Sequence, residues 1–437
     1  MKILYLAYAC EPGAGSEYGV GWMVPLTMAQ QYPDIEVYVL TRSRCRDKIE
    51  AALSELAEGK FQGMGKVTNL QIMFYDVPTL LYYKKEMSSH WGEQYNYLMW
   101  QLCVRGRVRK AIKDHGIDIL HHITFNQYRT PSPGYWMKIP FVIGPIGGAE
   151  VIAPALWQDL EEHSARKEAM RLKGRDLPLF RYFNTRSKNK KVILCSAREN
   201  VRRLEPYKGD SDMALMPAIG ISQNDINQTV VTASSERMGK PMTVVYAGKA
   251  LDWKGLHLFL RAASRAFVKP DMKEGKPALC IKLIGIRTDE EQKKVKSWVE
   301  EEGLQDSVDL IPFMKRDELL HVMTECDLSV YPAFRDSGSM SVLEACSLGC
   351  PTICFDAGGQ DAFPDDILIK VRVRETYNQC VEAFAERLRW CIEHRDELPA
   401  IGEKSRKWVS EHLTWEKKAA EFMRIYEGCI RLLRRLR

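Results

Sequence analysis

Short apolar runs alternate with longer amphipathic stretches along almost the whole chain of 437 residues. Runs that are apolar throughout suit parallel strands covered on both faces, and the amphipathic stretches suit the helices that connect them. Strands are expected at 3–9, 37–41, 70–75, 119–123, 141–143 and 192–196, and then at 242–248, 280–286, 308–313, 328–333 and 351–356. The pattern predicts an α/β protein with two doubly wound domains.

A polar stretch rich in Asn and Ser, "GISQNDINQTVVTASSERMGKP", separates the two series of strands. We interpret 219–241 as a linker between an N-terminal Rossmann-like domain over 1–218 and a C-terminal Rossmann-like domain over 242–414. The last stretch, 415–437, has apolar residues at helical spacing and predicts a long amphipathic helix.

Composition excludes several classes of protein. No apolar run reaches the ~20 residues that a membrane span needs, and the start "MKILYLAYACEP" does not resemble a signal peptide. The twelve cysteines are scattered, which is typical of reduced thiols in a cytosol. Cys346, Cys350 and Cys354 are close enough for a soft-metal site, but buried packing is the favoured reading.

The net charge of +6 is uneven, with basic runs at 104–113, 166–191 and 431–437. Such runs attract anionic lipid, although each is also typical of a solvated helix face. Together they favour a cytoplasmic protein with peripheral contact at the inner face of an anionic membrane. Nucleic acid is not expected as a partner, because no recognisable binding motif accompanies the charge.

A Gly-rich loop, "CEPGAGSEYGVGW", follows the first expected strand. Ligands of open α/β sheets bind at the carboxyl ends of strands, and Gly13 and Gly15 permit close approach of a ligand. The loop lacks the third glycine of a dinucleotide fingerprint, and no ribose-binding acid follows the second strand, so NAD is excluded. An ordinary strand–helix turn remains the alternative.

A second candidate site is "YAGKALDWKG", in which Lys249 and Lys254 follow a strand and the turn at Gly248. Two ammonium groups on one turn would offset the charge of a diphosphate. Two solvated lysines are the alternative.

The third candidate site is "RDSGSMSVLEACSLGCPTICFD", which joins a small-residue loop, a short helix and a strand. Backbone N–H groups at the start of such a helix favour phosphate. Asp336 and Glu344 are positioned to hold sugar hydroxyls. The alternatives are a turn role for Asp336 and a capping box formed by Ser341 and Glu344.

Two further patterns carry less weight. His121 and His122 are adjacent on a strand and point to opposite faces, so we expect one to be buried and the other to face a cleft. Asp210 and Asp212 form a D-x-D sequence, a metal and sugar-nucleotide signature, but it occurs in a polar loop rather than at the end of an apolar strand.

These motifs resemble glycosyltransferase family 4, the bacterial polysaccharide and glycolipid type, over most of the chain. The segment "GKALDWKG" resembles the family's G-R-x-x-x-x-K-G, with Lys249 in the Arg position, and "DSGSMSVLE" resembles its E-x7-E, with Asp336 in the first position. The resemblance implies the GT-B fold, which has two facing Rossmann-like doubly wound domains and a C-terminal helix that returns to the N-terminal domain. The segments "EPGAGSEYG" and "GPIGGAE" are similar to a bacterial subgroup.

The resemblance implies roles for individual residues. His122, preferred over His121, together with Lys249, Lys254 and Asp336, would be catalytic. The donor would contact Gly15, Gly248, Ser339, Met340, Ser341 and Glu344. The acceptor side would hold Glu17, His121 and Arg129.

The implied activity is a retaining hexosyltransferase that moves a sugar from a nucleoside-diphosphate donor, such as a UDP- or GDP-sugar, to a glycan or a polyprenyl- or lipid-linked acceptor. No cofactor or divalent metal is expected, since the two lysines and helix amides meet the diphosphate. A catalytically inactive GT-B module that binds glycan or a partner transferase, and a GT-B sugar-nucleotide epimerase, remain alternatives.

Overall fold

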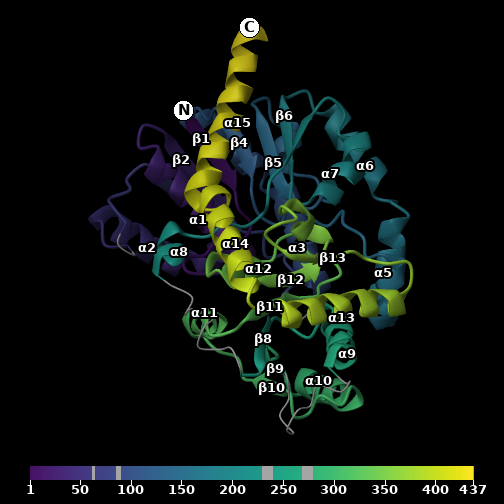
Figure 1. The fold of residues 1–437 in the computed structure, drawn as a ribbon. Helices are drawn as coiled ribbons and strands as arrows, with labels where there is room; N and C mark the ends of the chain where they lie inside the picture. The colour runs from purple at the N-terminus through teal and green to yellow at the C-terminus, as the bar shows by residue number, and fades with distance from the viewer. Residues whose placement is uncertain (62–63, 85–89, 229–239, 268–278, 437) are drawn as a thin grey trace. The chain divides into compact units, whose positions relative to one another are not determined.

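The computed structural model describes residues 1–61, 64–84, 90–228, 240–267 and 279–436, and it shows two compact units (Figure 1). Unit 1 comprises Met1–Ala149, Gly174–Gly220 and Trp415–Arg437, and unit 2 comprises Glu150–Lys173 and Ile221–Thr414. The predicted 1–218 domain therefore includes a segment, Glu150–Lys173, that groups with unit 2. Residues 229–239 of the predicted linker lie outside the described part.

Unit 1 is built on a parallel sheet in the order β3-β2-β1-β4-β5-β6-β7. Its strands are β1 (Lys2–Leu6), β2 (Glu36–Thr41), β3 (Leu70–Phe74), β4 (Ile119–His122), β5 (Phe141–Ile146), β6 (Lys191–Cys195) and β7 (Asp212–Leu215). Its helices are α1 (Ser16–Gln31), α2 (Arg46–Glu58), α3 (His90–Cys103), α4 (Arg105–His115), α6 (Leu177–Arg186), α7 (Arg198–Leu204) and α15 (Trp415–Leu436). The six expected strands are confirmed, and β7 is an edge strand that the sequence pattern missed.

Helix α15 completes unit 1, because it packs against α1 although the two are at opposite ends of the chain (Figure 1). Its Ala419, Phe422 and Tyr426 are buried, which fits the predicted apolar stripe. Lys418, on the same helix, is buried and donates a hydrogen bond to the backbone oxygen of Pro217. Burial lowers the pKa of Lys418 to about 8.

Unit 2 is built on a second parallel sheet in the order β10-β9-β8-β11-β12-β13. Its strands are β8 (Met242–Ala247), β9 (Leu279–Ile284), β10 (Val308–Ile311), β11 (Leu328–Tyr331), β12 (Thr352–Phe355) and β13 (Ile369–Val371). Its helices are α5 (Glu162–Leu172), α8 (Gln223–Gln228), α9 (Leu256–Phe267), α10 (Asp289–Glu301), α11 (Arg316–Thr324), α12 (Met340–Ser347), α13 (Tyr377–Glu393) and α14 (Leu398–His412). The five expected strands are confirmed, and the short edge strand β13 is an addition.

The segment Glu150–Lys173 lies between β5 and β6 in sequence but packs within unit 2. Ile152 and Leu156 are buried in the apolar core of unit 2 beside residues of α9 and α13. Asp159 accepts a hydrogen bond from the Tyr377 hydroxyl at 2.7 Å. Asp252 accepts one from the backbone N–H of Glu161 at 2.9 Å. Buried apolar and polar contacts together therefore assign the segment to unit 2.

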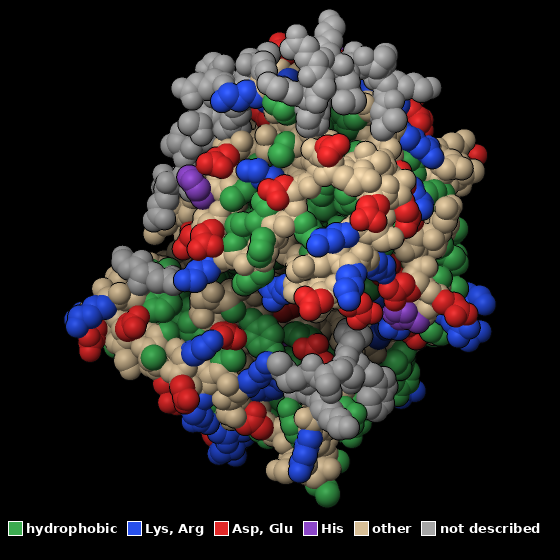
Figure 2. Space-filling model, turned by 90° about the horizontal axis from the view of Figure 1, so that it is seen from below, with side chains coloured by type: hydrophobic (Ala, Val, Ile, Leu, Met, Phe, Trp, Pro, Cys, Tyr) green, Lys and Arg blue, Asp and Glu red, His purple; other side chains and the backbone are tan. Residues whose placement is uncertain are grey.

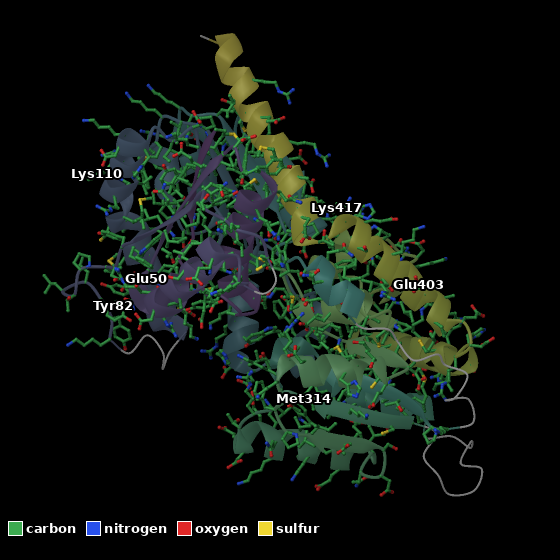
Figure 3. The ribbon with its side chains drawn as sticks, turned by 90° about the vertical axis from the view of Figure 1, so that its left-hand side faces the viewer. Glu50, Tyr82, Lys110, Met314, Glu403 and Lys417 are labelled. Atoms are coloured by element: carbon green, nitrogen blue, oxygen red, sulfur yellow. The ribbon has the colours of Figure 1, made fainter. Side chains whose placement is uncertain are left out.

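The surface is charged but mixed. Lysine, arginine and acidic side chains interleave across the face seen from below in Figure 2. Lys110, on the outer side of α4 (Figure 3), is exposed and pairs with Asp114. In the described residues, no helix combines the length and apolar character required to cross a membrane.

Candidate functional site

Lys254 and Asp336 form the centre of the candidate site in unit 2. Lys254 Nζ lies 2.5 Å from Asp336 Oδ2 and 2.6 Å from the hydroxyl of Tyr331. The Tyr331 hydroxyl donates to the same carboxylate, and the backbone N–H of Gly338 donates to Asp336 Oδ1 at 3.3 Å. An ammonium, a phenol and a carboxylate thus converge after β11, at the carboxyl edge of the sheet, where open α/β folds bind ligands.

Burial keeps the phenol of this cluster protonated. Tyr331 is the last residue of β11, and burial, with Asp336 nearby, raises the pKa of its hydroxyl well above the ordinary value. The phenol therefore stays protonated and donates to Asp336. An ammonium has three N–H donors, and Tyr331 and Asp336 take two of those on Lys254. The third is left for a phosphate oxygen.

Two glycines allow the backbone to bring these groups together. Gly255 has φ +68°, and a Cβ there would lie 2.1 Å from the backbone oxygen of Pro332. Gly358 has φ +60°, and a Cβ there would lie 2.5 Å from the backbone oxygen of Asp336. Both positions combine a left-handed backbone with close approach of another backbone segment, which only glycine accepts without strain. Larger residues at either position would displace Lys254 or Asp336.

Glu344 lies on α12 and is 5% exposed. Its Oε1 accepts a hydrogen bond from Arg316 Nε at 2.6 Å, and Arg316 also pairs with Asp225 at 3.2 Å. Burial raises the pKa of Glu344, and Arg316 opposes that rise. The ion pair leaves Oε2 able to accept ligand hydroxyls.

The predicted capping box of Ser341 and Glu344 is wrong. Ser339 is the N-cap of α12, and its side-chain oxygen accepts from the backbone N–H of Val342 at 3.3 Å. The side chain of Glu344 turns to Arg316 instead, because the helix begins two residues earlier than the box requires. Met340 and Ser341 occupy the first turn, where their backbone N–H groups have no acceptor within the helix.

Lys249 and Gly248 lie in the loop after β8. Lys249 is exposed, and its backbone oxygen accepts from the Tyr246 hydroxyl at 2.7 Å. Within the described residues its ammonium is in no ion pair. It is therefore available to an anionic ligand, and its role at a diphosphate stays a prediction. Gly248 N donates to the backbone oxygen of Ile284 at 2.9 Å, which fixes the turn.

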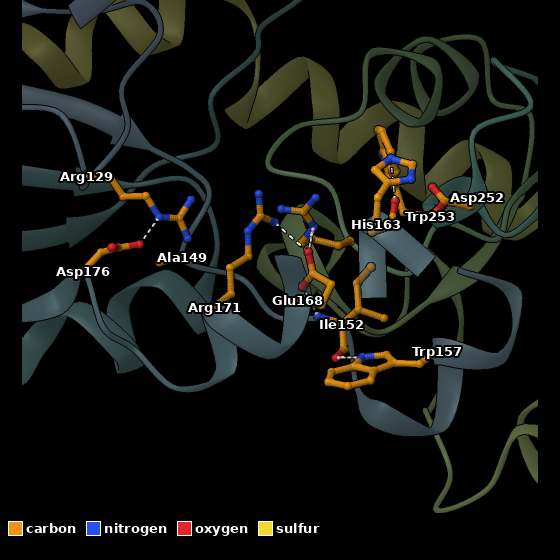
Figure 4. Close-up of polar contacts among 12 residues, drawn as sticks. Arg129, Ala149, Ile152, Trp157, His163, Glu168, Arg171, Asp176, Asp252 and Trp253 are labelled. Carbon is orange, nitrogen blue, oxygen red and sulfur yellow. Dashed lines mark hydrogen bonds and ion pairs between the residues drawn. The ribbon is translucent and has the colours of Figure 1, made fainter. Parts of the chain in front are cut away.

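The loop that carries Asp336 has a support from α5 that the sequence pattern missed. This support is Glu168, which is 3% exposed (Figure 4). Its Oε1 lies 2.9 Å from Arg171 Nη1 and 3.6 Å from Arg335 Nε. Its Oε2 accepts a hydrogen bond from the backbone N–H of Ile152 at 3.1 Å. Arg335 directly precedes Asp336. Arg316 and Tyr331 were also missed, although Tyr331 ends an apolar run, which is the only signal that marked it.

Unit 1 holds the predicted acceptor-side residues. Gly15 is the N-cap of α1, and Glu17 in the first turn accepts from the backbone N–H of Phe125 at 2.9 Å. Arg129 is engaged by Asp176 at 2.7 Å (Figure 4). These contacts order the loops at the ends of β1 and β4. The acceptor roles of Glu17 and Arg129 stay predictions, as does the donor contact predicted for Gly15.

Both histidines of β4 are buried, contrary to the expectation that one faces a cleft. His121 Nε2 lies 3.0 Å from the Gly144 oxygen and must carry the proton, so Nδ1 accepts from the Tyr426 hydroxyl at 2.6 Å. His122 Nε2 lies 3.3 Å from Gln101 Nε2. Burial lowers the pKa of both imidazoles to about 3. A central strand covered on both faces explains why neither points outward.

The rival metal sites do not form in the described part of the chain, where no group of three or more His, Cys, Asp or Glu is arranged to hold an ion. Cys346, Cys350 and Cys354 are buried as free thiols. Asp212 lies on β7 and pairs with Lys190 at 2.5 Å.

Known proteins share this architecture. Residues 228–408, which include the Lys254, Asp336 and Glu344 cluster, match the family model described as glycosyl transferases group 1. No curated protein matches the chain. Solved structures do, and the sucrose-phosphate synthase of Thermosynechococcus elongatus is similar at 13% identity, with 98% of both chains covered and a TM-score of 0.63.

Two others are Anabaena HepE in complex with UDP-glucose and WaaG, a glycosyltransferase involved in lipopolysaccharide biosynthesis. HepE is 14% identical with a TM-score of 0.56, and the alignment covers 97% of this chain and 99% of HepE. WaaG is 15% identical with a TM-score of 0.58, and the alignment covers 96% of this chain and 99% of WaaG. The chain has the GT-B fold. At these identities the likeness establishes the fold, and the match to the group 1 glycosyltransferase model is confined to residues 228–408.

Proposed function

We propose that the chain is a retaining glycosyltransferase of the family 4 type that uses a nucleoside-diphosphate sugar. The observation that carries the proposal is the Lys254–Tyr331–Asp336 cluster beside the start of α12, inside the segment matched by the group 1 model. A cation with a free N–H, exposed helix amides and carboxylates that accept hydroxyls provide what a sugar nucleotide needs.

In this proposal the diphosphate lies against Lys249, Lys254 and the backbone N–H groups of Met340 and Ser341. Negative charge builds on the leaving diphosphate as the glycosidic bond breaks, and preorganised cations and N–H groups stabilise it. We infer that these groups suffice without a divalent metal. Asp336, held by Lys254, Tyr331 and Gly338, accepts a hydroxyl of the donor sugar, and Glu344 holds the ribose through its free oxygen.

Retention is the less direct part of the proposal. Retaining hydrolases use a carboxylate nucleophile on the sugar. Asp336 is already held by an ammonium and a phenol, which lowers its nucleophilicity, so we assign it to hydroxyl binding. In the corresponding route the diphosphate departs and the acceptor hydroxyl attacks on the same face of the sugar, and the hydroxyl proton passes to the departing phosphate oxygen. A glycan or lipid-linked acceptor is proposed, and WaaG of lipopolysaccharide biosynthesis is a precedent for such chemistry on this fold.

The experiment is nucleotide release from a panel of UDP- and GDP-sugars, with and without glycan and lipid-linked acceptors. Acceptor-dependent release, with the anomeric configuration kept in the product by NMR, supports the proposal. An epimerised donor without acceptor would instead identify an isomerase, and donor binding without turnover on any acceptor would identify a binding module. Activity that survives in both the Lys254→Ala and the Glu344→Ala variants would reject the site.

A further inference from the structure

A hollow in unit 2 lies between β13 and α13 and shares no residue with the candidate donor site. Its volume is about 420 Å³, which is within the range of small-ligand pockets. The lining residues are Lys370, Val371, Arg372, Arg374, Ala383, Glu386, Arg387 and Trp390. Four of the eight are cations and one is an acid.

Two sequence patterns bring these residues to the hollow: alternation along 370–374 and helical spacing along α13. Lys370, Arg372 and Arg374 alternate with Val371 and Val373, which pack into the apolar core, so the three cations share the side away from it. Ala383, Glu386, Arg387 and Trp390 are spaced three and four apart on α13 and lie on one stripe of the helix. The hollow is therefore bounded by a basic edge segment and a mixed helix stripe.

Among the residues that the structure describes, carboxylates neutralise only one of the four cations. Lys370 Nζ lies 3.1 Å from Asp356 and 2.9 Å from Asp365, so two carboxylates compensate it. Arg372, Arg374 and Arg387 form no ion pair with any described residue, and Glu386 is the one acid that lines the hollow with them. Neighbouring Arg389 differs, since it pairs with Glu382. A local excess of guanidinium charge remains.

The aromatic residue of the hollow is already covered on its faces. The Arg387 guanidinium lies 5.1 Å from the centroid of the Trp390 ring, and His394 stacks on that ring at 4.8 Å. The indole therefore holds Arg387 in place and does not serve as a platform for a base or sugar. Guanidinium forks match the paired oxygens of phosphate, so the chemistry favours a compact anion with several phosphate oxygens.

We propose that this hollow binds a small anion with at least two phosphate groups, of the pyrophosphate class, through Arg372, Arg374 and Arg387. The proposal does not rest on the proposed transferase activity. Glu386 opposes binding, because its carboxylate repels the anion. Neutralising Glu386 should therefore strengthen binding, whereas neutralising the arginines should weaken it. General damage to the fold would weaken binding in both kinds of variant, so opposite changes in affinity identify a specific site.

The test is calorimetric titration of inorganic pyrophosphate into the full chain in the Lys254→Ala background, which weakens the candidate donor site. The Arg372→Gln/Arg374→Gln double variant should bind at least about tenfold more weakly, since each charge-assisted hydrogen bond is worth roughly 1.5 kcal/mol or more. Glu386→Gln should bind several-fold more tightly. Arg389→Gln, on the same helix but already paired, is the matched control and should bind as the parent does.

Thermal unfolding of each variant guards against misfolding. Unchanged pyrophosphate affinity in the double variant, or weaker affinity in Glu386→Gln, overturns the proposal. A second arm measures co-sedimentation with vesicles that contain phosphatidylglycerol. Vesicle binding that depends on Arg372 and Arg374 without any pyrophosphate binding would assign the arginines to lipid headgroups and also overturn the proposal of a small soluble ligand.

Discussion

Replacing Lys254 by alanine removes the ammonium that links the proposed diphosphate position to Asp336. A unit charge about 4 Å from a phosphate oxygen is worth about 4 kcal/mol at the effective dielectric constant near a protein surface. Asp336, which lies 2.5 Å from the ammonium, offsets part of this attraction. Loss of one electrostatic donor at a transition state costs on the order of 3 kcal/mol. We therefore expect kcat to fall by about two orders of magnitude.

The assay is nucleotide release under saturating donor, with UDP affinity measured separately by calorimetry. Asp336→Asn is the informative partner, because it leaves Lys254 charged and uncompensated. It should tighten UDP binding while turnover falls, whereas Lys254→Ala should weaken UDP binding. Lys293→Ala, an exposed lysine on α10, is the matched control and should behave as wild type. A kcat for Lys254→Ala within threefold of wild type, or weaker UDP binding in Asp336→Asn, would refute the reasoning.

Three further outcomes are expected. Glu344→Gln should raise the dissociation constant of UDP about tenfold, because a charged hydrogen bond to the ribose is lost; calorimetry measures this. The stability of the protein should change little, because the variant loses the Arg316 ion pair but no longer buries a carboxylate; thermal unfolding measures this. His121 and His122 have folded pKa values of about 3, below the unfolded value, so the free energy of unfolding should fall as pH drops below about 6.5, by up to about 1.4 kcal/mol per pH unit for each histidine. Urea unfolding at about pH 7 and about pH 5 checks this, and His122→Gln should reduce the pH slope by about half. Gly255→Ala should displace Lys254 and destabilise the protein by about 1–3 kcal/mol, and wild-type stability together with wild-type activity in this variant would contradict the assigned role of the glycine.

The architecture could be predicted because buried parallel strands have a simple signature. Every expected strand is present. A strand in a sheet covered on both faces is apolar along its whole length, so a continuous apolar run identifies it. The two missed strands, β7 and β13, are short and lie at sheet edges, where one side of the strand has no neighbour and the apolar pattern weakens. Residues 150–173 were assigned to the first domain because they precede β6 in sequence, and only their three-dimensional packing reveals the partner core.

The candidate site was predictable in part for a similar reason. Lys254, Asp336 and Glu344 belong to local motifs with fixed spacing. Tyr331 is close in sequence to Asp336 but far from Lys254, and Arg316 is far from Glu344. The roles of Tyr331 and Arg316 therefore depend on which segments meet in the fold, which motif spacing alone does not encode. The histidines were misjudged because alternation along a strand was taken to point one of them toward a cleft, whereas the strand is central and both of its faces are covered.

The path of the chain through the two units has a consequence for its synthesis. Helix α1 emerges from the ribosome long before its packing partner α15, since α1 ends at Gln31 and α15 begins at Trp415. Unit 1 therefore cannot complete its core until α15 has been made, and the surface of α1 that packs against α15 stays uncovered until then. Unit 2 consists of Glu150–Lys173 and Ile221–Thr414, so all of its residues have been made once Thr414 has been added. Unit 2 can therefore reach its native state before unit 1, although most of it is encoded later.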